Sequence, residues 1–166
     1  MALLDILKWP DPRLTRACAR VPDPVALAGL AQDMLDTMYA APGRGLAGPQ
    51  VGQMLRVFVM DTTWKEGERS PVICVNPRIV DRSESIAEGT EACLSIPGVD
   101  MSVPRSEWID MTWTDTEGRD HAERMTGFDA ICAQHEHDHL DGIVIFDRIP
   151  PSARTAAEQA YTASRG

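Results

Sequence analysis

The stretch AQHEHDHLDG, residues 133–142, contains three histidines within five residues and a glutamate directly after the first. If this stretch is helical, His135 and His139 are one turn apart and project from the same face. Two imidazoles at this spacing can bind one metal ion. Glu136, offset by about 100° around the helix axis, can reach a water molecule on that ion and act as a base. His137 points to the far side, and we do not expect it to be a ligand.

The sequence around the histidines predicts where this helix begins and ends. Thr126, with Asp129 three residues later, resembles a capping box, and Gly142 is suited to end the helix after about Leu140. The histidine face continues into apolar residues, which indicates that the imidazoles are buried. A chance H-E-x-x-H pattern on a solvated helix is the alternative interpretation. The apolar residues on this face are Phe128, Ile131 and Cys132.

The rest of the chain predicts one earlier helix and several strands. Asp23 can cap a helix that starts at Pro24 and carries an apolar stripe as far as Met38. Strands outnumber helices and do not alternate with them, so the α+β class is favoured over a parallel α/β sheet. A tail at 152–166 can form a short helix but offers little to bury. The predicted strands are 55–61, 71–80, a hairpin over 107–125 that turns near Glu117–Gly118, and IVIF at 143–146.

Length and charge exclude several classes of protein. A chain of 166 residues suits a single domain, residues 1–166, with a compact part at about 3–150 and a short tail at 151–166. The net charge of −9 and the lack of a Lys/Arg cluster argue against nucleic-acid binding. The apolar run at the N-terminus is too short for a signal peptide or a membrane span. The four cysteines are widely scattered, as expected for reduced thiols in the cytoplasm.

A catalytic metal site usually has three protein ligands and leaves one position for water. Downstream of His139 the chain offers Asp141, Asp147 and Glu158 but no further histidine. The third ligand is therefore expected upstream, where the thiolate of Cys93, in the segment TEACLSIPG, is the best candidate. A buried structural cysteine is the alternative interpretation of Cys93. The cysteines that we interpret as buried packing residues are Cys18, Cys74 and Cys132.

Three stretches, taken in order, resemble the signature motifs of the peptide deformylase family. They are GRGLAGPQVG at 43–52, EACLSIPG at 91–98 and QHEHDHLDG at 134–142. The segments LKWPDPRLTR at 7–16 and VPR at 103–105 also fall where the family has similar sequence. Three ordered motifs are far more specific than any one of them alone.

This resemblance, which covers roughly residues 3–150, implies the peptide deformylase fold: antiparallel β-sheets packed around a central H-E-x-x-H helix, with an N-terminal helix. It implies one divalent metal ion bound by Cys93, His135 and His139. The family's metal is Fe(II), and zinc, nickel or cobalt can occupy the site. Members are hydrolases that remove the formyl group from the N-terminal methionine of newly made proteins and release formate.

The resemblance also assigns roles around the metal. It makes Glu136 the acid and base of the reaction. The Gln50 side chain and the backbone N–H of Leu94 would hydrogen-bond the oxyanion that forms at the formyl carbon. The backbone of Gly45 would align the substrate peptide. Taken alone, Gln50 would be interpreted as a surface residue after a turn; the motif favours the oxyanion role.

The sequence departs from the family pattern at three places. Gly48 and Ala92 stand where the family usually has alanine and glycine, respectively. Arg44 stands where the family usually has an aliphatic residue that lines the methionine pocket; its guanidinium either turns to solvent or changes which first residue is accepted. An ion pair between Asp138 and Arg105 is a further hypothesis. The pocket wall from the helix would still be apolar, formed by Phe128, Ile131 and Cys132.

The expected function is deformylation of nascent N-formylated peptides, in the cytoplasm, with at most a transient encounter with the ribosome. The short tail lacks the long basic helix that some members use for ribosome docking. One alternative is a related metal hydrolase acting on another N-acyl peptide or small amide, for which Arg44 is the main support. A second alternative is a non-catalytic protein with a deformylase-like fold. An ordinary H-E-x-x-H endopeptidase is a weaker rival because its downstream ligand is missing.

Overall fold

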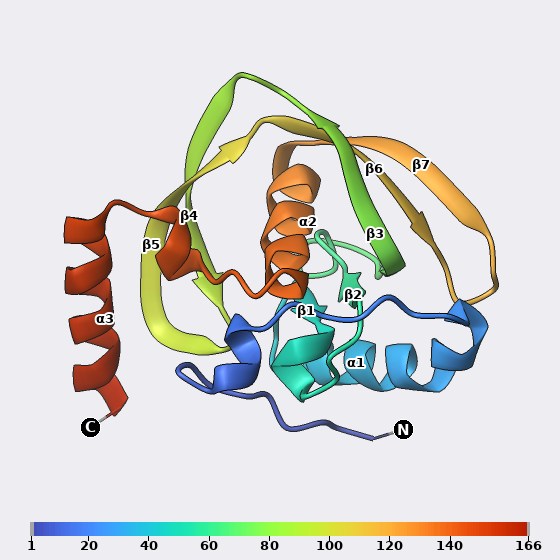
Figure 1. Cartoon of the computed structure of the whole chain (residues 1–166), viewed down its shortest axis with the longest axis horizontal. Helices are drawn as coiled ribbons and strands as arrows, with labels where there is room; N and C mark the ends of the chain where they lie inside the picture. The colour runs from blue at the N-terminus through green and yellow to red at the C-terminus, as the bar shows by residue number, and fades with distance from the viewer. Residues whose placement is uncertain (1, 166) are drawn as a thin grey trace.

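The computed structural model describes residues 2–165 and has the histidine helix α2 (Gly127–Leu140) at its centre (Figure 1). A five-stranded sheet in the order β1-β2-β3-β6-β7 and a two-stranded sheet of β4 and β5 arch around this helix. Neighbouring strands are antiparallel throughout both sheets. The α+β prediction is therefore confirmed. The strands are β1 (Gly45–Ala47), β2 (Val57–Met60), β3 (Val72–Arg82), β4 (Ile86–Cys93), β5 (Ile96–Ser106), β6 (Trp108–Thr114) and β7 (Asp120–Thr126).

The hairpin of β6 and β7 forms as the alternating pattern predicts. Ile109, Met111 and Trp113 are buried, while the residues between them are more exposed. These side chains pack on the face of α2 that carries Ala130 and Ala133. Each buried side chain removes apolar surface from water, so the hairpin is held against the helix mainly by hydrophobic burial.

The first helix begins differently from the prediction. Residues Pro24–Leu27 form a 3₁₀ turn, and α1 (Ala28–Ala40) follows it. Asp23 precedes this turn, but its side chain makes no capping hydrogen bond. The stripe that ends at Met38 is buried against β2, as expected from its helical spacing.

Two local predictions were wrong. The IVIF segment forms the end of a loop and a 3₁₀ turn, Ile145–Arg148, rather than a strand. Val144, Ile145 and Phe146 are buried near β5 without entering a sheet, so burial and not strand pairing explains their apolar character. Thr126 precedes α2, but its side chain makes no capping hydrogen bond. Asp129 instead accepts a hydrogen bond from the hydroxyl of Thr62, so the predicted capping box is absent from α2.

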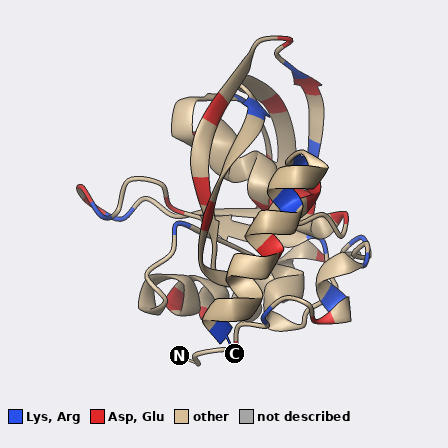
Figure 2. Ribbon diagram, turned by 90° about the vertical axis from the view of Figure 1, so that its left-hand side faces the viewer, with Lys and Arg blue, Asp and Glu red and all other residues tan. Residues whose placement is uncertain are grey.

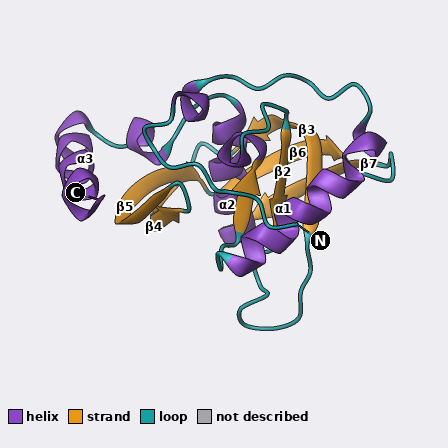
Figure 3. Cartoon of the chain, turned by 90° about the horizontal axis from the view of Figure 1, so that it is seen from below, coloured by secondary structure: helices purple, strands orange, loops and turns teal. Residues whose placement is uncertain are grey.

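The C-terminal tail buries more apolar surface than predicted. Helix α3 (Pro151–Arg165) lies beside the two-stranded sheet, at one end of the molecule (Figure 3). Tyr161 is buried, and its hydroxyl donates a hydrogen bond to the carbonyl oxygen of Trp9 at 2.7 Å. The rings of Trp9 and Phe146 meet edge to face, with centroids 5.0 Å apart. The tail therefore covers an aromatic cluster, which corrects the expectation that it buries little.

None of the helices within residues 2–165 is long and apolar enough to cross a membrane.

Candidate metal centre

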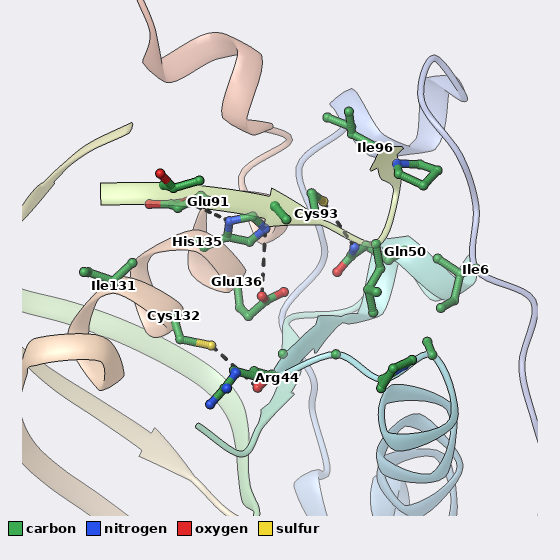
Figure 4. A pocket seen from close by; sticks show the side chains of 18 of the residues that line it. Ile6, Arg44, Gln50, Glu91, Cys93, Ile96, Ile131, Cys132, His135 and Glu136 are labelled. Carbon is green, nitrogen blue, oxygen red and sulfur yellow. Dashed lines mark hydrogen bonds and ion pairs between the residues drawn. The ribbon is translucent and has the colours of Figure 1, made fainter. Parts of the chain in front are cut away.

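Cys93 at the end of β4 comes together with His135 and His139, which lie on one face of α2. Figure 4 shows Cys93 and His135 side by side. One ligand atom from each residue lies within 4.8 Å of the others, and the Cys93 Sγ is 3.4 Å from the His139 Nε2. All three side chains are buried. One thiolate and two imidazoles are a donor set suited to a divalent transition metal. The three residues expected to be ligands therefore converge, as a shared metal ion requires, and His137 is not in this group.

Local structure explains how the cysteine reaches the helix. Strand β4 has an irregular register between Glu91 and Cys93, and Cys93 pairs directly with Ile96 across a tight turn. The irregularity and the turn together direct the thiol toward α2. On the helix, His135 and His139 are one turn apart, and their rings meet at 5.1 Å between centroids.

Glu91, which our sequence interpretation did not identify, holds the first histidine in place. Its Oε1 accepts a hydrogen bond from the Nδ1 of His135 at 2.9 Å. A proton on Nδ1 leaves the Nε2 of His135 with a free electron pair for a metal. Glu91 and Cys93 are two residues apart on one strand, and both are buried while Ala92 between them is exposed, so they face the same side. That spacing was the signal in the sequence that could have identified Glu91.

A chain of buried ion pairs lies behind Glu91. Arg105 donates two hydrogen bonds of 2.9 Å to the carboxylate of Glu91 and a third of 2.6 Å to Asp138. The hypothesised pair of Arg105 and Asp138 is therefore present. Arg148 donates two further hydrogen bonds to Asp138, an interaction that the sequence did not indicate. Burial alone would raise the pKa of Asp138, but Arg148 and Arg105 outweigh it and lower that pKa.

Glu136 lies beside the ligands with its carboxylate buried. Its Oε2 is 3.9 Å from the Nε2 of His135, and its Oε1 has no hydrogen-bond partner within residues 2–165. Burial raises the pKa of Glu136, which favours its protonated form. A Cβ at Gly45 would lie 2.5 Å from the Oε2, so the backbone can approach the carboxylate this closely only at a glycine.

Gln50 is buried next to the cysteine, not exposed at the surface. Its Oε1 accepts a hydrogen bond from the backbone N–H of Ala47 at 2.9 Å. This contact turns the Nε2 toward Ser95 Oγ, at 3.1 Å, and toward Cys93 Sγ, at 3.6 Å. Gln50 therefore presents an amide N–H group beside the thiol. Ser95, which the sequence interpretation missed, is the side chain that orients this amide.

The two imidazoles determine the charge of the thiol. Burial alone would raise the pKa of the Cys93 thiol, but His139 and His135 lower it well below its usual value. Cys93 is thus a thiolate beside two rings, which is the form that binds metals. Cys18, Cys74 and Cys132 are free and buried, and burial raises the pKa of each thiol. This contrast agrees with their predicted packing role.

A pocket of about 500 Å³ is lined by Cys93 and His135 and by Glu136 beside them. Ile131 and Cys132 form part of its wall, as predicted, and Phe128 lies half exposed at its edge. Arg44 also borders the pocket, but its guanidinium donates two hydrogen bonds to the carboxylate of Glu66 at 3.0 and 2.6 Å. In Figure 4 this guanidinium points away from Cys93 and His135. The pocket therefore keeps an apolar wall despite Arg44.

The chain matches a family model described as polypeptide deformylase over residues 3–155. It is 49% identical over 152 residues to a peptide deformylase of Alkalilimnicola ehrlichii, covering 89% of this chain and 82% of that protein. It is 40% identical over 163 residues to a peptide deformylase of Afipia carboxidovorans, covering 98% and 95% of the two chains.

Solved structures agree with these relatives. The fold matches the crystal structure of a peptide deformylase from Legionella pneumophila with a TM-score of 0.91, at 35% identity, over 99% of this chain and 96% of that chain. A peptide deformylase from Thermus thermophilus matches with a TM-score of 0.89, at 41% identity, over 97% and 94% of the two chains. The sheets and the central helix are thus arranged as in these structures.

Proposed function

The chain belongs to the peptide deformylase family and removes the N-formyl group from nascent peptides, and we propose that Cys93, His135 and His139 hold the metal ion that this reaction requires. The observation that carries the proposal is the convergence of these three buried donors, two of which line a pocket together with Glu136. The alternative, a hydrolase for a different N-acyl substrate, is not favoured by the relatives. A divalent cation bound here would acidify a water molecule and polarise the formyl oxygen.

We assign the proton transfers to Glu136. Its carboxylate takes a proton from the attacking water while the water oxygen bonds to the formyl carbon. The same proton then goes to the leaving amine as the carbon–nitrogen bond breaks, which yields formate and a free N-terminus. Because burial raises the pKa of Glu136, this side chain is suited to hold the proton between the two steps.

We assign stabilisation of the oxyanion to Gln50 and to the backbone N–H of Leu94. The Nε2 of Gln50 is directed to the site by Ala47 and Ser95, so it does not need to reorganise during the reaction. One such donor typically contributes about 3 kcal/mol to transition-state stabilisation. Leu94 follows the cysteine directly and lines the same pocket, which supports this assignment.

We propose that the substrate peptide lies along β1. This strand is at the edge of its sheet, so Gly45 has backbone groups that are free to pair with an extended peptide. The side chain of the first residue of such a peptide would enter the pocket and pack against the apolar wall formed by Ile131 and Cys132. A methionine side chain suits this wall because it is unbranched and apolar.

We propose Fe(II) as the native metal, with zinc, nickel or cobalt able to replace it, because a thiolate with two imidazoles accepts any of these ions. We further propose that the enzyme works in the cytoplasm and meets nascent chains only transiently at the ribosome. Helix α3 supports the transient encounter only, since it carries two arginines, Arg154 and Arg165, alongside Glu158 and is therefore not strongly basic. Figure 2 shows its basic and acidic segments interspersed.

Formate release and metal content test the proposal together. We expect the wild-type protein, purified without oxygen, to release formate from formyl-Met-Ala-Ser and to contain one metal ion. A Cys93→Ala variant should lose both the metal and the activity, because two imidazoles alone bind weakly. Cys18→Ala, a buried cysteine away from the ligands, is the matched control and should retain both. Retention of the metal by Cys93→Ala would refute the ligand assignment.

A further inference from the structure

The loop between β2 and β3, residues 61–71, contacts the pocket edge through Trp64. The indole Nε1 of Trp64 donates a hydrogen bond to the carbonyl oxygen of Gly43 at 2.9 Å. Gly43 lines the pocket and lies 21 residues earlier in the chain. The loop also carries Lys65, Glu66, Glu68 and Arg69, and its contact with Gly43 through Trp64 lies at the edge of the pocket.

Aromatic packing holds Trp64 in this position. Its ring meets the ring of Tyr39 edge to face, with centroids 5.1 Å apart. The Tyr39 hydroxyl donates a hydrogen bond to Asp61 at 2.6 Å, and the guanidinium of Arg69 lies 3.9 Å from the centre of the Tyr39 ring. Asp61 also accepts a hydrogen bond from the backbone N–H of Ser70 at 2.8 Å, which closes the loop at its base. The indole is therefore held rigidly by α1 and by the loop itself.

The segment that Trp64 contacts has little freedom to move without altering the site. A Cβ at Gly43 would lie 2.7 Å from Leu94 Cδ1, and one at Gly45 would lie 2.5 Å from Glu136 Oε2. The segment 43–45 thus passes directly between the residue assigned to the oxyanion and the residue assigned to proton transfer. A small displacement of this segment would change the edge on which the peptide pairs.

A second contact ties the same segment to the same loop. The side chain of Arg44 donates hydrogen bonds to the carbonyl oxygen of Thr62 and to the carboxylate of Glu66. The carbonyl oxygen of Arg44 accepts a hydrogen bond from the backbone N–H of Asp61 at 2.8 Å. The loop therefore holds both the backbone and the side chain of the residue between the two glycines.

From these contacts we propose that Trp64 is a positioning residue for the substrate: it holds the carbonyl of Gly43, and with it the 43–45 edge, in the conformation that pairs with the formylated peptide. The inference rests on the proposed function and extends it. It requires peptide binding to depend on Trp64 although the indole is not part of the pocket lining. A merely structural tryptophan would change stability and leave peptide binding unaltered.

The variant Trp64→Phe tests this, because phenylalanine keeps an aromatic ring against Tyr39 and removes the N–H donor, together with the second ring of the indole. We expect KM for formyl-Met-Ala-Ser to rise about fivefold, with kcat and metal content within a factor of two of wild type. Amide hydrogen exchange in a fragment spanning 42–47 should become about fivefold faster. Trp108→Phe, the same substitution on β6, is the control and should leave KM and this exchange unchanged.

The outcomes separate the inference from the proposed function. Failure of the wild-type protein to release formate refutes the proposed function, and the exchange measurement still tests whether Trp64 holds the segment. Unchanged KM and unchanged exchange in Trp64→Phe overturn the inference. If Trp64→Phe does not fold, Tyr39→Leu serves instead, since it removes the ring that packs edge to face against the indole and leaves the indole N–H in place. That variant should raise KM about twofold, and a wild-type KM would overturn the inference.

Discussion

At the scale of single residues, Glu91 has the broadest influence on the metal centre. Its carboxylate faces His135 on one side and Arg105 on the other, so it joins a metal ligand to a buried cation. Burial raises the pKa of Glu91, and hydrogen bonds from His135 and Arg105 more than compensate and lower it. The carboxylate is therefore charged, and a charged acceptor makes the His135 ring a better donor to a metal.

We predict that Glu91→Gln weakens metal binding without abolishing the fold. Glutamine can still accept a hydrogen bond from His135, but it removes the charge that orients the ring and pairs with Arg105. Loss of such a partner typically lowers metal affinity about 10- to 100-fold. The measurement is the metal retained during dialysis against graded concentrations of a chelator.

Glu88→Gln is the control for Glu91→Gln. Glu88 lies on the same strand and is exposed, so its substitution removes an equal charge without touching the ligands. Equal metal retention by wild type and Glu91→Gln would contradict the role assigned to Glu91.

Residue chemistry determined how much of the site could be predicted from sequence. Cys93, His135 and His139 were predictable because few side chains bind transition metals and two of them have helical spacing. The direction of the Arg44 side chain could not be predicted, because its partner Glu66 is 22 residues away in a loop that has no regular sequence pattern. Contacts of that kind depend on tertiary structure and leave no periodic signal in the sequence.

At the scale of elements, hydrophobic periodicity predicted the helices and the β6–β7 hairpin but missed the β4–β5 hairpin. Strand β4 carries Glu88, Gly89 and Glu91, which are poor strand formers by composition. It forms because β5 pairs with it along most of its length and because Cys93 is buried against α2. The apolar run that leads into the 3₁₀ turn at Ile145–Arg148 was wrongly predicted as a strand, because a short apolar run does not distinguish a strand from a buried turn.

The turn of the β6–β7 hairpin gives a prediction of pH dependence. A hydrogen bond from His121 and backbone N–H groups of Arg119 and Glu117 lower the pKa of Asp115 to about 2. A carboxyl pKa that is lower in the folded state stabilises the fold above the unfolded value of about 4. We predict that this stabilisation is lost as the pH falls from about 4 to about 2.

Carboxyl chemical shifts during an NMR acid titration would measure this pKa. Asp115→Asn should remove the corresponding part of the pH dependence of the free energy of unfolding. A midpoint near 4 for Asp115 would show that the turn does not hold the carboxylate as described.

At the scale of the whole molecule, the N- and C-terminal segments meet behind the metal centre. The aromatic cluster of Trp9, Phe146 and Tyr161 belongs to the same buried group as Cys93 and Ile96. Trp9 also donates its backbone N–H to the carbonyl oxygen of Ser95 at 2.8 Å. Helix α3 therefore supports the strand end that carries the cysteine, although the helix itself lies at the edge of the molecule (Figure 1).

This arrangement predicts that Tyr161 contributes to global stability. Tyr161→Ala removes a ring that is 2% exposed, and loss of a large buried ring typically costs about 3 to 5 kcal/mol. Tyr161→Phe keeps the ring and loses only the hydrogen bond to Trp9, at a cost of about 1 kcal/mol. Urea denaturation of both variants measures these differences. Gln159→Ala, on the exposed side of α3, should change stability by less than about 0.5 kcal/mol. If Tyr161→Ala were as stable as Gln159→Ala, α3 would be an appendage and the cluster behind Cys93 would be stable without it.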